Sequence, residues 1–237
     1  MAVTRALVLH HHREDNPGLI GEALVSRGFE LSVLLFNESS PTPSLDDIDL
    51  VVILGSSSAV YDLDIERAWF SRELALIEEA DRRGITVFGI CFGAQALCRH
   101  FGGVVEPGEE PEIGWQVVEP TPDSPVGAGP WFEYHFDVCR LPAVATLWAT
   151  SSRCVQAFAI GRHVGVQFHP ENDAAQLRDW FEAGGDDARS LGYNPTALVG
   201  QTADEEPRAR ERARELFDVV VAHARSYDRA VGPTTSV

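Results

Sequence analysis

Short runs of aliphatic and β-branched residues alternate along this chain with helical patterns, and this alternation restricts the fold more than any other feature. The expected strands are 6–10, 31–36, 50–54, 86–90 and 164–168. Helical patterns at 18–27 and 65–82 separate the first strand from the second and the third from the fourth. We therefore predict an α/β fold of three layers, in which an open, mostly parallel sheet carries helices on both faces. Active sites of such sheets form at the carboxyl ends of the strands.

The remaining segments complete the expected organisation. The stretch 106–130 is rich in proline, glycine and acidic residues, so we expect it to loop outside the sheet. The runs 155–160 and 164–168 predict an antiparallel hairpin. From residue 173 onward the sequence reads as helical, most clearly over 208–224. We expect a single domain over 1–237, with a core of about 1–172 and a helical tail of about 173–230.

Composition narrows the functional classes. The formal net charge is −17, with 36 acidic against 19 basic side chains, so a nucleic-acid backbone would be repelled. There is no run of about 18 apolar residues and no secretory leader pattern, so we expect a cytoplasmic protein without a membrane partner. The four cysteines form no CxxC pair, and a chain of this size needs no disulfide framework. At least one cysteine is therefore expected to carry chemistry.

Cys91 is the candidate for that chemistry. It follows the strand 86–90 directly and stands in the sequence Gly89-Ile90-Cys91-Phe92-Gly93, the Gly-x-nucleophile-x-Gly pattern of a strand-to-helix elbow. The two glycines leave room for a sharp turn and a strained central residue. The helix that follows places its positive N-terminal end beneath the sulfur, which favours the reactive thiolate. The alternative is a cysteine buried only for packing.

His169 is the candidate base. It ends an apolar strand in the tripeptide His169-Pro170-Glu171, in which the proline favours an extended chain before it. The side chains of His169 and Glu171 then project to the same side, where the carboxylate would hold the tautomer of the ring and support the imidazolium. Alone, the tripeptide is weak evidence, since it is usually an ordinary turn at the end of a strand.

Together the two motifs resemble those of class I glutamine amidotransferases. The nucleophile motif of that family reads Gly-x-Cys-x-Gly-x-Gln, here Gly89 to Gln95, and the downstream motif is His-Pro-Glu. The resemblance is closest to the stand-alone domains that are similar to the amidotransferase part of GMP synthase, and the segments 54–62, 112–115 and 134–137 also look like that branch. It implies a flavodoxin-like architecture and a Cys91–His169–Glu171 triad.

The resemblance also implies the residues around the triad. Two backbone N–H groups would form the oxyanion hole, one from Phe92 and one from the Gly55–Ser56 turn, where this sequence has Gly-Ser-Ser in place of the common Gly-Gly-Pro. Between Gly55 and Ser56 the choice stays open. The residues implied in binding substrate are Gln95, Tyr134, His135, Phe136 and Asp137. Gln95 is otherwise a polar residue on the first turn of a helix, and Tyr134 replaces a smaller polar residue.

Three consecutive histidines, His10, His11 and His12, invite a metal interpretation. Three adjacent side chains in an extended chain cannot all point one way, and no carboxylate pattern completes a site. We therefore expect no metal and no cofactor, and interpret these histidines as substrate contacts or solvated side chains.

The function implied is a glutaminase-type amidotransferase, which releases ammonia from the γ-amide of glutamine through a γ-glutamyl thioester on Cys91. The sequence carries no ATP-grasp or P-loop signature, so a synthetase that receives the ammonia would be a separate chain. One alternative keeps the triad but cleaves other γ-glutamyl amides, as a γ-glutamyl peptidase or hydrolase. Another is a non-catalytic regulatory domain, which the intact motifs disfavour.

Overall fold

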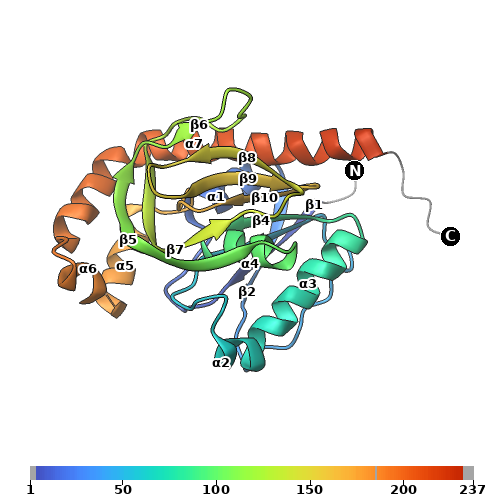
Figure 1. Ribbon diagram of the computed structural model, residues 1–237, viewed down its shortest axis with the longest axis horizontal. Coiled ribbons are helices and arrows are strands. Elements are labelled where there is room, and N and C mark those ends of the chain that lie inside the picture. The colour runs from blue at the N-terminus through green and yellow to red at the C-terminus, as the bar shows by residue number, and fades with distance from the viewer. Residues whose placement is uncertain (1–3, 185, 232–237) are drawn as a thin grey trace.

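A computed structural model describes residues 4–184 and 186–231. Its centre is a sheet of eight strands, which lies among the helices in Figure 1. The strand order is β2-β1-β3-β4-β10-β9-β8-β6, with the first five strands parallel and the last three antiparallel. The parallel strands are β2 (Phe29–Leu35), β1 (Thr4–His10), β3 (Leu50–Ile53), β4 (Thr86–Ile90) and β10 (His163–Val166). The antiparallel strands are β9 (Val155–Ile160), β8 (Ala145–Thr150) and β6 (Glu119–Pro120). The expected hairpin is β9–β10.

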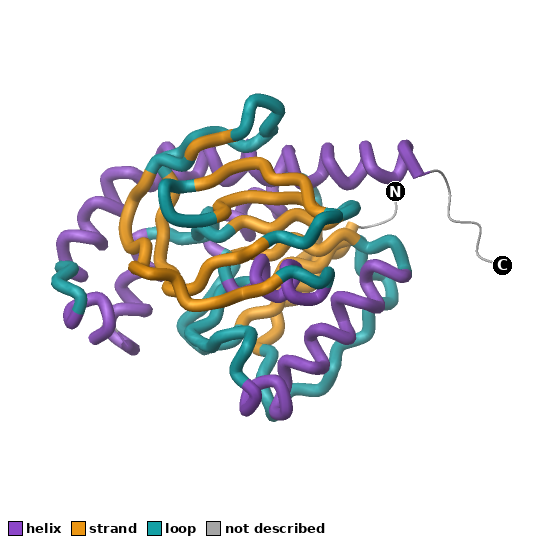
Figure 2. Tube along the Cα trace, in the orientation of Figure 1, coloured by secondary structure: helices purple, strands orange, loops and turns teal. Residues whose placement is uncertain are grey.

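Helices cover both faces of this sheet because alternate residues of each buried strand point to opposite faces. On β1, Ala6 and Val8 pack toward α1 (Gly18–Ser26) and α7 (Pro195–Val231). Leu7 and Leu9 face the other way, toward α3 (Ser71–Arg82) and α4 (Phe92–His100). Figure 2 shows the same separation of helices around the strands. The predicted three-layer α/β fold is confirmed.

The segment 106–130 corrects the expectation of a loop. Its first part belongs to β5 (Val104–Gln116), which pairs with β7 (Trp131–Arg140) in a separate two-stranded sheet, and β6 joins the edge of the main sheet. The register shifts between Pro107 and Glu112, so the proline and glycine occupy an irregular part of the ribbon instead of ending it. As expected, no part of the segment inserts between the parallel strands of the main sheet.

The helical segments are divided more finely than expected. The pattern at 65–82 comprises α2 (Leu63–Ile65), a π-helical turn η1 (Glu66–Phe70) and α3. The tail forms α5 (Ala174–Gly184), α6 (Asp186–Ser190) and the long α7, which contacts both α1 and α5. Among the described residues, no helix is long and apolar enough to span a membrane.

Close backbone packing fixes α4 against the sheet. A Cβ atom on Gly93 would overlap the carbonyl oxygen of Ile53 at the end of β3. A Cβ atom on Gly89 would overlap the backbone of Gly93 and Ala94. Both glycines are therefore required by contact between backbones, which brings the first turn of α4 directly over the ends of β3 and β4.

Gly93→Ala should destabilise the fold, because the added methyl group meets backbone atoms that cannot move aside. We expect a loss of about 1–3 kcal/mol or more in the free energy of unfolding, measured by urea denaturation. Gly200→Ala on α7 is the matched control, since a Cβ there meets no atom within 4 Å. That variant should gain about 0.5–1 kcal/mol from helix propensity. A Gly93→Ala protein as stable as the wild type would contradict the packing described.

Candidate active site

The carboxyl ends of four neighbouring parallel strands bring the candidate residues together. His11 follows β1, Gly55 lies just after β3, Cys91 follows β4 and His169 lies just after β10. A cavity of about 360 Å³ opens at this edge, within the range of small-molecule sites. It is lined by His12, Glu14, Asp15, Gly55, Ser56, Ser57, Cys91, Tyr134, His169, Trp180, Ala183, Gly184 and Asp187. The predicted nucleophile and base thus face one cavity.

Cys91 sits in a strained backbone conformation at the elbow. Its φ of 51° and ψ of −105° lie in a region that residues with a Cβ rarely adopt. Its N–H donates to the Val166 carbonyl oxygen of β10 at 2.8 Å, and its own carbonyl accepts from Gln95 N–H at 3.0 Å. These hydrogen bonds and the two glycine contacts keep Cys91 in its strained conformation. Cys91 is 94% buried and lies at the cavity wall. The expected elbow is therefore present in the backbone.

His169 and Glu171 form a buried hydrogen-bonded pair. Nδ1 of His169 lies 2.7 Å from Oε1 of Glu171, and both side chains are almost fully buried. Nε2 of His169 is buried and hydrogen-bonds to no other group among the described residues. Burial alone would lower the pKa of His169, but the Glu171 carboxylate and the nearby Cys91 raise it well above its ordinary value. Glu171 and Cys91 thus favour the protonated form of the ring, and His169 lines the cavity.

His11 is neither a solvated side chain nor part of the cavity wall. It is buried, its Nδ1 lies 2.8 Å from the Gly55 carbonyl oxygen, and its Nε2 lies 2.8 Å from Oε2 of Glu73 on α3. Burial would lower the pKa of His11, yet the Glu73 carboxylate and the Gly55 carbonyl raise it above 6.5. The charged pair therefore anchors the loop after β3 from behind.

His12 fixes the next part of the same loop. Its Nε2 accepts a hydrogen bond from the Ser57 N–H at 3.2 Å and lies 3.1 Å from the Ser57 hydroxyl. His10 turns aside, with Nδ1 2.8 Å from the His12 carbonyl oxygen. The three histidines have different environments, as their positions in an extended chain required. His12, which lines the cavity, is the one that is open to a substrate contact.

The residues expected to bind substrate separate into two groups. Tyr134 lines the cavity, whereas Gln95, His135, Phe136 and Asp137 are outside its lining. Gln95 is buried and donates to Oε1 of Gln167 at 3.4 Å, and the His135 ring is buried among carboxylates on the other side of β7. Contact between these four residues and the substrate stays a prediction, and their positions outside the cavity lining do not favour it.

The helical tail supplies a wall that the sequence did not predict. Trp180 of α5 packs edge-on against His169 with ring centroids 5.1 Å apart, and its Nε1–H donates to Asp15 at 2.9 Å. Ala183, Gly184 and Asp187 extend the same wall. No local motif marks these residues, because their role depends on how α5 packs beside the sheet.

Comparison with known proteins agrees with this architecture. The family model of class-I glutamine amidotransferases matches residues 16–179. A glutamine-hydrolysing GMP synthase from Brucella melitensis is 34% identical in an alignment of 197 residues that covers 76% of this chain and 36% of that enzyme. The same enzyme from Brucella ovis is 34% identical over 76% of this chain and 35% of its own length. The chain thus spans little more than a third of the length of these relatives.

Solved structures give the same result. A glutamine amidotransferase from Thermotoga maritima superimposes with a TM-score of 0.84 and 28% identity, over 92% of this chain and 98% of that one. A glutamine amidotransferase from Methylobacillus flagellatus shares the fold with a TM-score of 0.81 and 21% identity, over 94% of this chain and 96% of that one. The fold is that of a class-I glutamine amidotransferase. The chain belongs to the class-I glutamine amidotransferase family, whose members act on the amide of glutamine.

Glu171→Gln should shift the pH dependence of turnover. An amide in place of the carboxylate removes the charge that raises the pKa of His169, so the alkaline limb of kcat/KM should move to lower pH. We expect kcat to fall about 10²- to 10⁴-fold, as when other triads lose this group. Glu171→Asp, which keeps the charge, should retain more of the alkaline limb. An unchanged pH profile in Glu171→Gln would show that this carboxylate does not tune His169.

Glu73→Gln should lower stability in a pH-dependent way. The pKa of His11 is raised in the folded state, so the pair stabilises fully below pH 6.5 and less as pH rises through the raised pKa. The difference in free energy of unfolding between wild type and Glu73→Gln, about 1–3 kcal/mol at low pH, should shrink with rising pH. Glu109→Gln, exposed on β5, is the control and should show no such trend. Urea denaturation at several pH values measures both.

Proposed function

We propose that this chain hydrolyses the γ-amide of glutamine with Cys91 as the nucleophile, His169 as the base and acid, and Glu171 as the group that orients His169. The observation that carries the proposal is the strained Cys91 at a strand-to-helix elbow, on the same cavity as a buried His169 paired with Glu171. The thiolate attacks the γ-carbonyl carbon, and His169 protonates the departing ammonia. Water activated by the same ring then hydrolyses the γ-glutamyl thioester and releases glutamate.

Ser56 and Phe92 are the backbone donors that we propose for the oxyanion. Phe92 begins α4, and the N–H groups of the first helical turn have no acceptor within the helix. The C=O and N–H of a trans peptide point in opposite directions, so the His11 bond to the Gly55 carbonyl orients the N–H of Ser56 as well. The Ser57 N–H is already bonded to His12. These contacts favour Ser56 over Gly55.

The cavity suits a substrate that carries an ammonium group. Three of its lining side chains are carboxylates, Glu14, Asp15 and Asp187, and the net charge of −17 adds to a negative field. Asp15 is already engaged by Trp180 and by the His12 N–H, which leaves Glu14 and Asp187 for the α-ammonium group of a glutamyl substrate. Trp180 would shield the thioester from bulk water.

The ammonia acceptor that we propose is a synthetase on a separate chain. The relatives named GMP synthase are nearly three times as long as the region that matches this chain. The rest of those enzymes therefore has no counterpart in the matched region. We further propose a cytoplasmic location, in which the four free cysteines would stay reduced.

Cys91→Ala should abolish turnover of glutamine, with a loss of roughly 10⁴- to 10⁶-fold in kcat, because no thioester can form. The assay couples glutamate release to a dehydrogenase, and a panel of γ-glutamyl peptides and anilides is tested beside glutamine. Cys98→Ser, a buried cysteine outside the cavity, is the matched control and should keep its activity. Full glutaminase activity in Cys91→Ala would refute the nucleophile. Preferential turnover of γ-glutamyl peptides would instead identify a γ-glutamyl hydrolase.

A further inference from the structure

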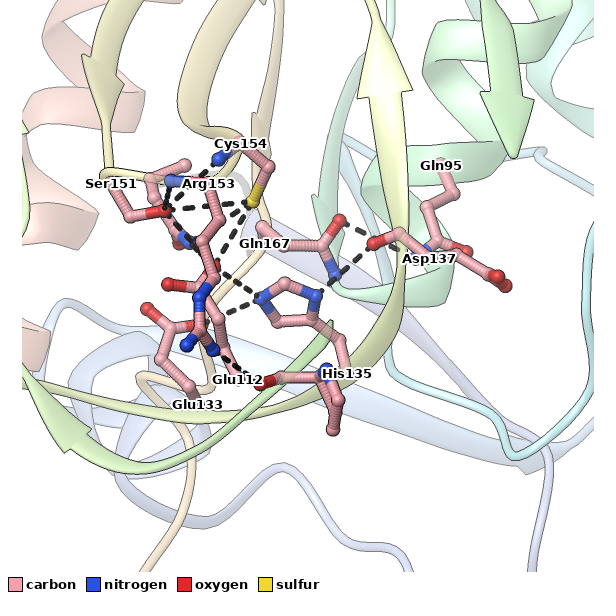
Figure 3. A network of polar contacts seen from close by, with 11 residues as sticks. Gln95, Glu112, Glu133, His135, Asp137, Ser151, Arg153, Cys154 and Gln167 are labelled. Atoms are coloured by element: carbon pink, nitrogen blue, oxygen red, sulfur yellow. Dashed lines mark hydrogen bonds and ion pairs between the residues drawn. The ribbon is translucent and has the colours of Figure 1, made fainter. Parts of the chain in front are cut away.

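Four side chains of the kind that bind metals meet behind the active-site strand β7 (Figure 3). We name Glu112, Glu133, His135 and Cys154 the β7 cluster; they come from β5, from β7 twice, and from the turn between β8 and β9. Glu112 and Glu133 are at most 1% exposed and His135 is 4% exposed. The ligand atoms of Glu112, His135 and Cys154 all lie within 4.8 Å of one another. The cluster is separate from the cavity that Cys91 and His169 line.

The spacing of these atoms matches the shell of a single small cation. Nε2 of His135 lies 3.2 Å from Oε2 of Glu112 and 3.3 Å from Oε2 of Glu133, and Sγ of Cys154 lies 3.1 Å from Oε2 of Glu112. In a tetrahedral zinc site with ordinary Zn–N, Zn–O and Zn–S lengths, neighbouring ligand atoms are about 3.3–3.6 Å apart. Three of the ligand atoms are thus already grouped, whereas the Glu133 carboxylate is near His135 but not within 4.8 Å of every other ligand atom. A rotation of its side chain is needed to bring it to the same ion.

Three buried polar atoms of the cluster have no hydrogen bond among the described residues, although two of them form an ion pair with each other. Both carboxylate oxygens of Glu133 and Nε2 of His135 are fully buried and form no hydrogen bond among the described residues. Nε2 lies close to two carboxylates, yet the geometry is not that of a hydrogen bond to either. Leaving a buried carboxylate without a partner is costly, so such groups are normally paired or bound to a metal. Nε2 of His135 lies between the two carboxylates, so it faces the interior of the cluster.

Outer contacts hold the ligands in the orientation that metal binding needs. Nδ1 of His135 lies 3.1 Å from the Asp137 carbonyl oxygen, which can only accept, so in the neutral ring the lone pair is on Nε2. Oε2 of Glu112 accepts from the Gln156 amide at 2.9 Å and from the Ser151 hydroxyl at 3.0 Å. Arg153 ties the turn that carries Cys154 to β5 through the Pro111 carbonyl, at 2.7 Å. Each proposed ligand except Glu133 is thus oriented by a neighbour.

We propose that the β7 cluster binds one Zn²⁺ ion through Nε2 of His135, Sγ of Cys154 and the carboxylates of Glu112 and Glu133. A site with four protein ligands has no position open for substrate, so the ion is structural. It ties the β5–β7 ribbon to the turn between β8 and β9, and binding releases the Cys154 thiol proton to solvent. This proposal replaces the expectation from the sequence that the chain binds no metal. The ligands of this cluster lie in separate segments and form no short motif.

Metal analysis of the full chain tests the site. The protein is produced without a histidine tag and with Cys91→Ser, so that the active-site thiolate cannot bind the ion. After exposure to Zn²⁺ and dialysis, we expect one zinc per chain by mass spectrometry, and a melting temperature that rises with added zinc. Substitution with Co²⁺ should give the thiolate-to-cobalt charge-transfer absorption of a cysteine ligand.

Variants decide whether the ion is in the cluster. Cys154→Ser and His135→Gln should lose the zinc and the melting shift, and Cys154→Ser should lose the charge-transfer band while circular dichroism shows a folded chain. Cys98→Ser is the matched control and should keep all three signals, since its side chain contacts backbone carbonyls and not the cluster. A folded parent protein that retains no zinc and gives no cobalt band overturns the proposal. So does zinc that survives both cluster substitutions.

Discussion

The contact of Gly93 with the end of β3 is the constraint on which the site depends. Because no side chain separates the two backbones, α4 starts directly above the sheet, and the chain has only one residue in which to turn from β4 into the helix. That residue, Cys91, takes the strained positive-φ conformation that the turn requires. The strain persists because the parallel strand β10 accepts its N–H and the sheet cannot yield. Placement of the sulfur is thus a consequence of sheet packing.

Three buried histidines next to carboxylates support this edge in different ways. His169 with Glu171 faces the cavity and has one nitrogen free, which suits proton transfer. His11 has both nitrogens bonded, to Glu73 and to the Gly55 carbonyl, which suits a fixed anchor. His135 has Nδ1 engaged but Nε2 directed among acidic groups, which suits an ion. Similar residue pairs therefore perform different tasks, and the bonding of the second nitrogen distinguishes them.

Those parts of the fold and site that depend on contiguous residues could be predicted from the sequence. The elbow around Cys91 and the His169-Pro170-Glu171 segment are each encoded within a few residues, and buried parallel strands read as apolar runs. The β5–β7 ribbon was missed because a pairing across many residues carries no local signal, and Pro107 and the neighbouring glycine and glutamates mimic a loop. Trp180 and the β7 cluster were missed for the same reason, since tertiary packing alone brings their partners together.

Strand β7 connects the cluster to the catalytic edge. Alternation along the strand directs Tyr134 toward the cavity and its neighbours Glu133 and His135 toward the cluster, while the carbonyl of Phe132 accepts the N–H of His169 at 2.8 Å. A movement of β7 would therefore shift the cavity wall and the backbone of His169 together. If an ion fixes β7 from behind, loss of that ion should weaken substrate binding and should also make the orientation of the His169 imidazole less fixed. The cluster and the catalytic base thus contact the same strand, so an ion bound behind β7 would act on the active site without touching the substrate.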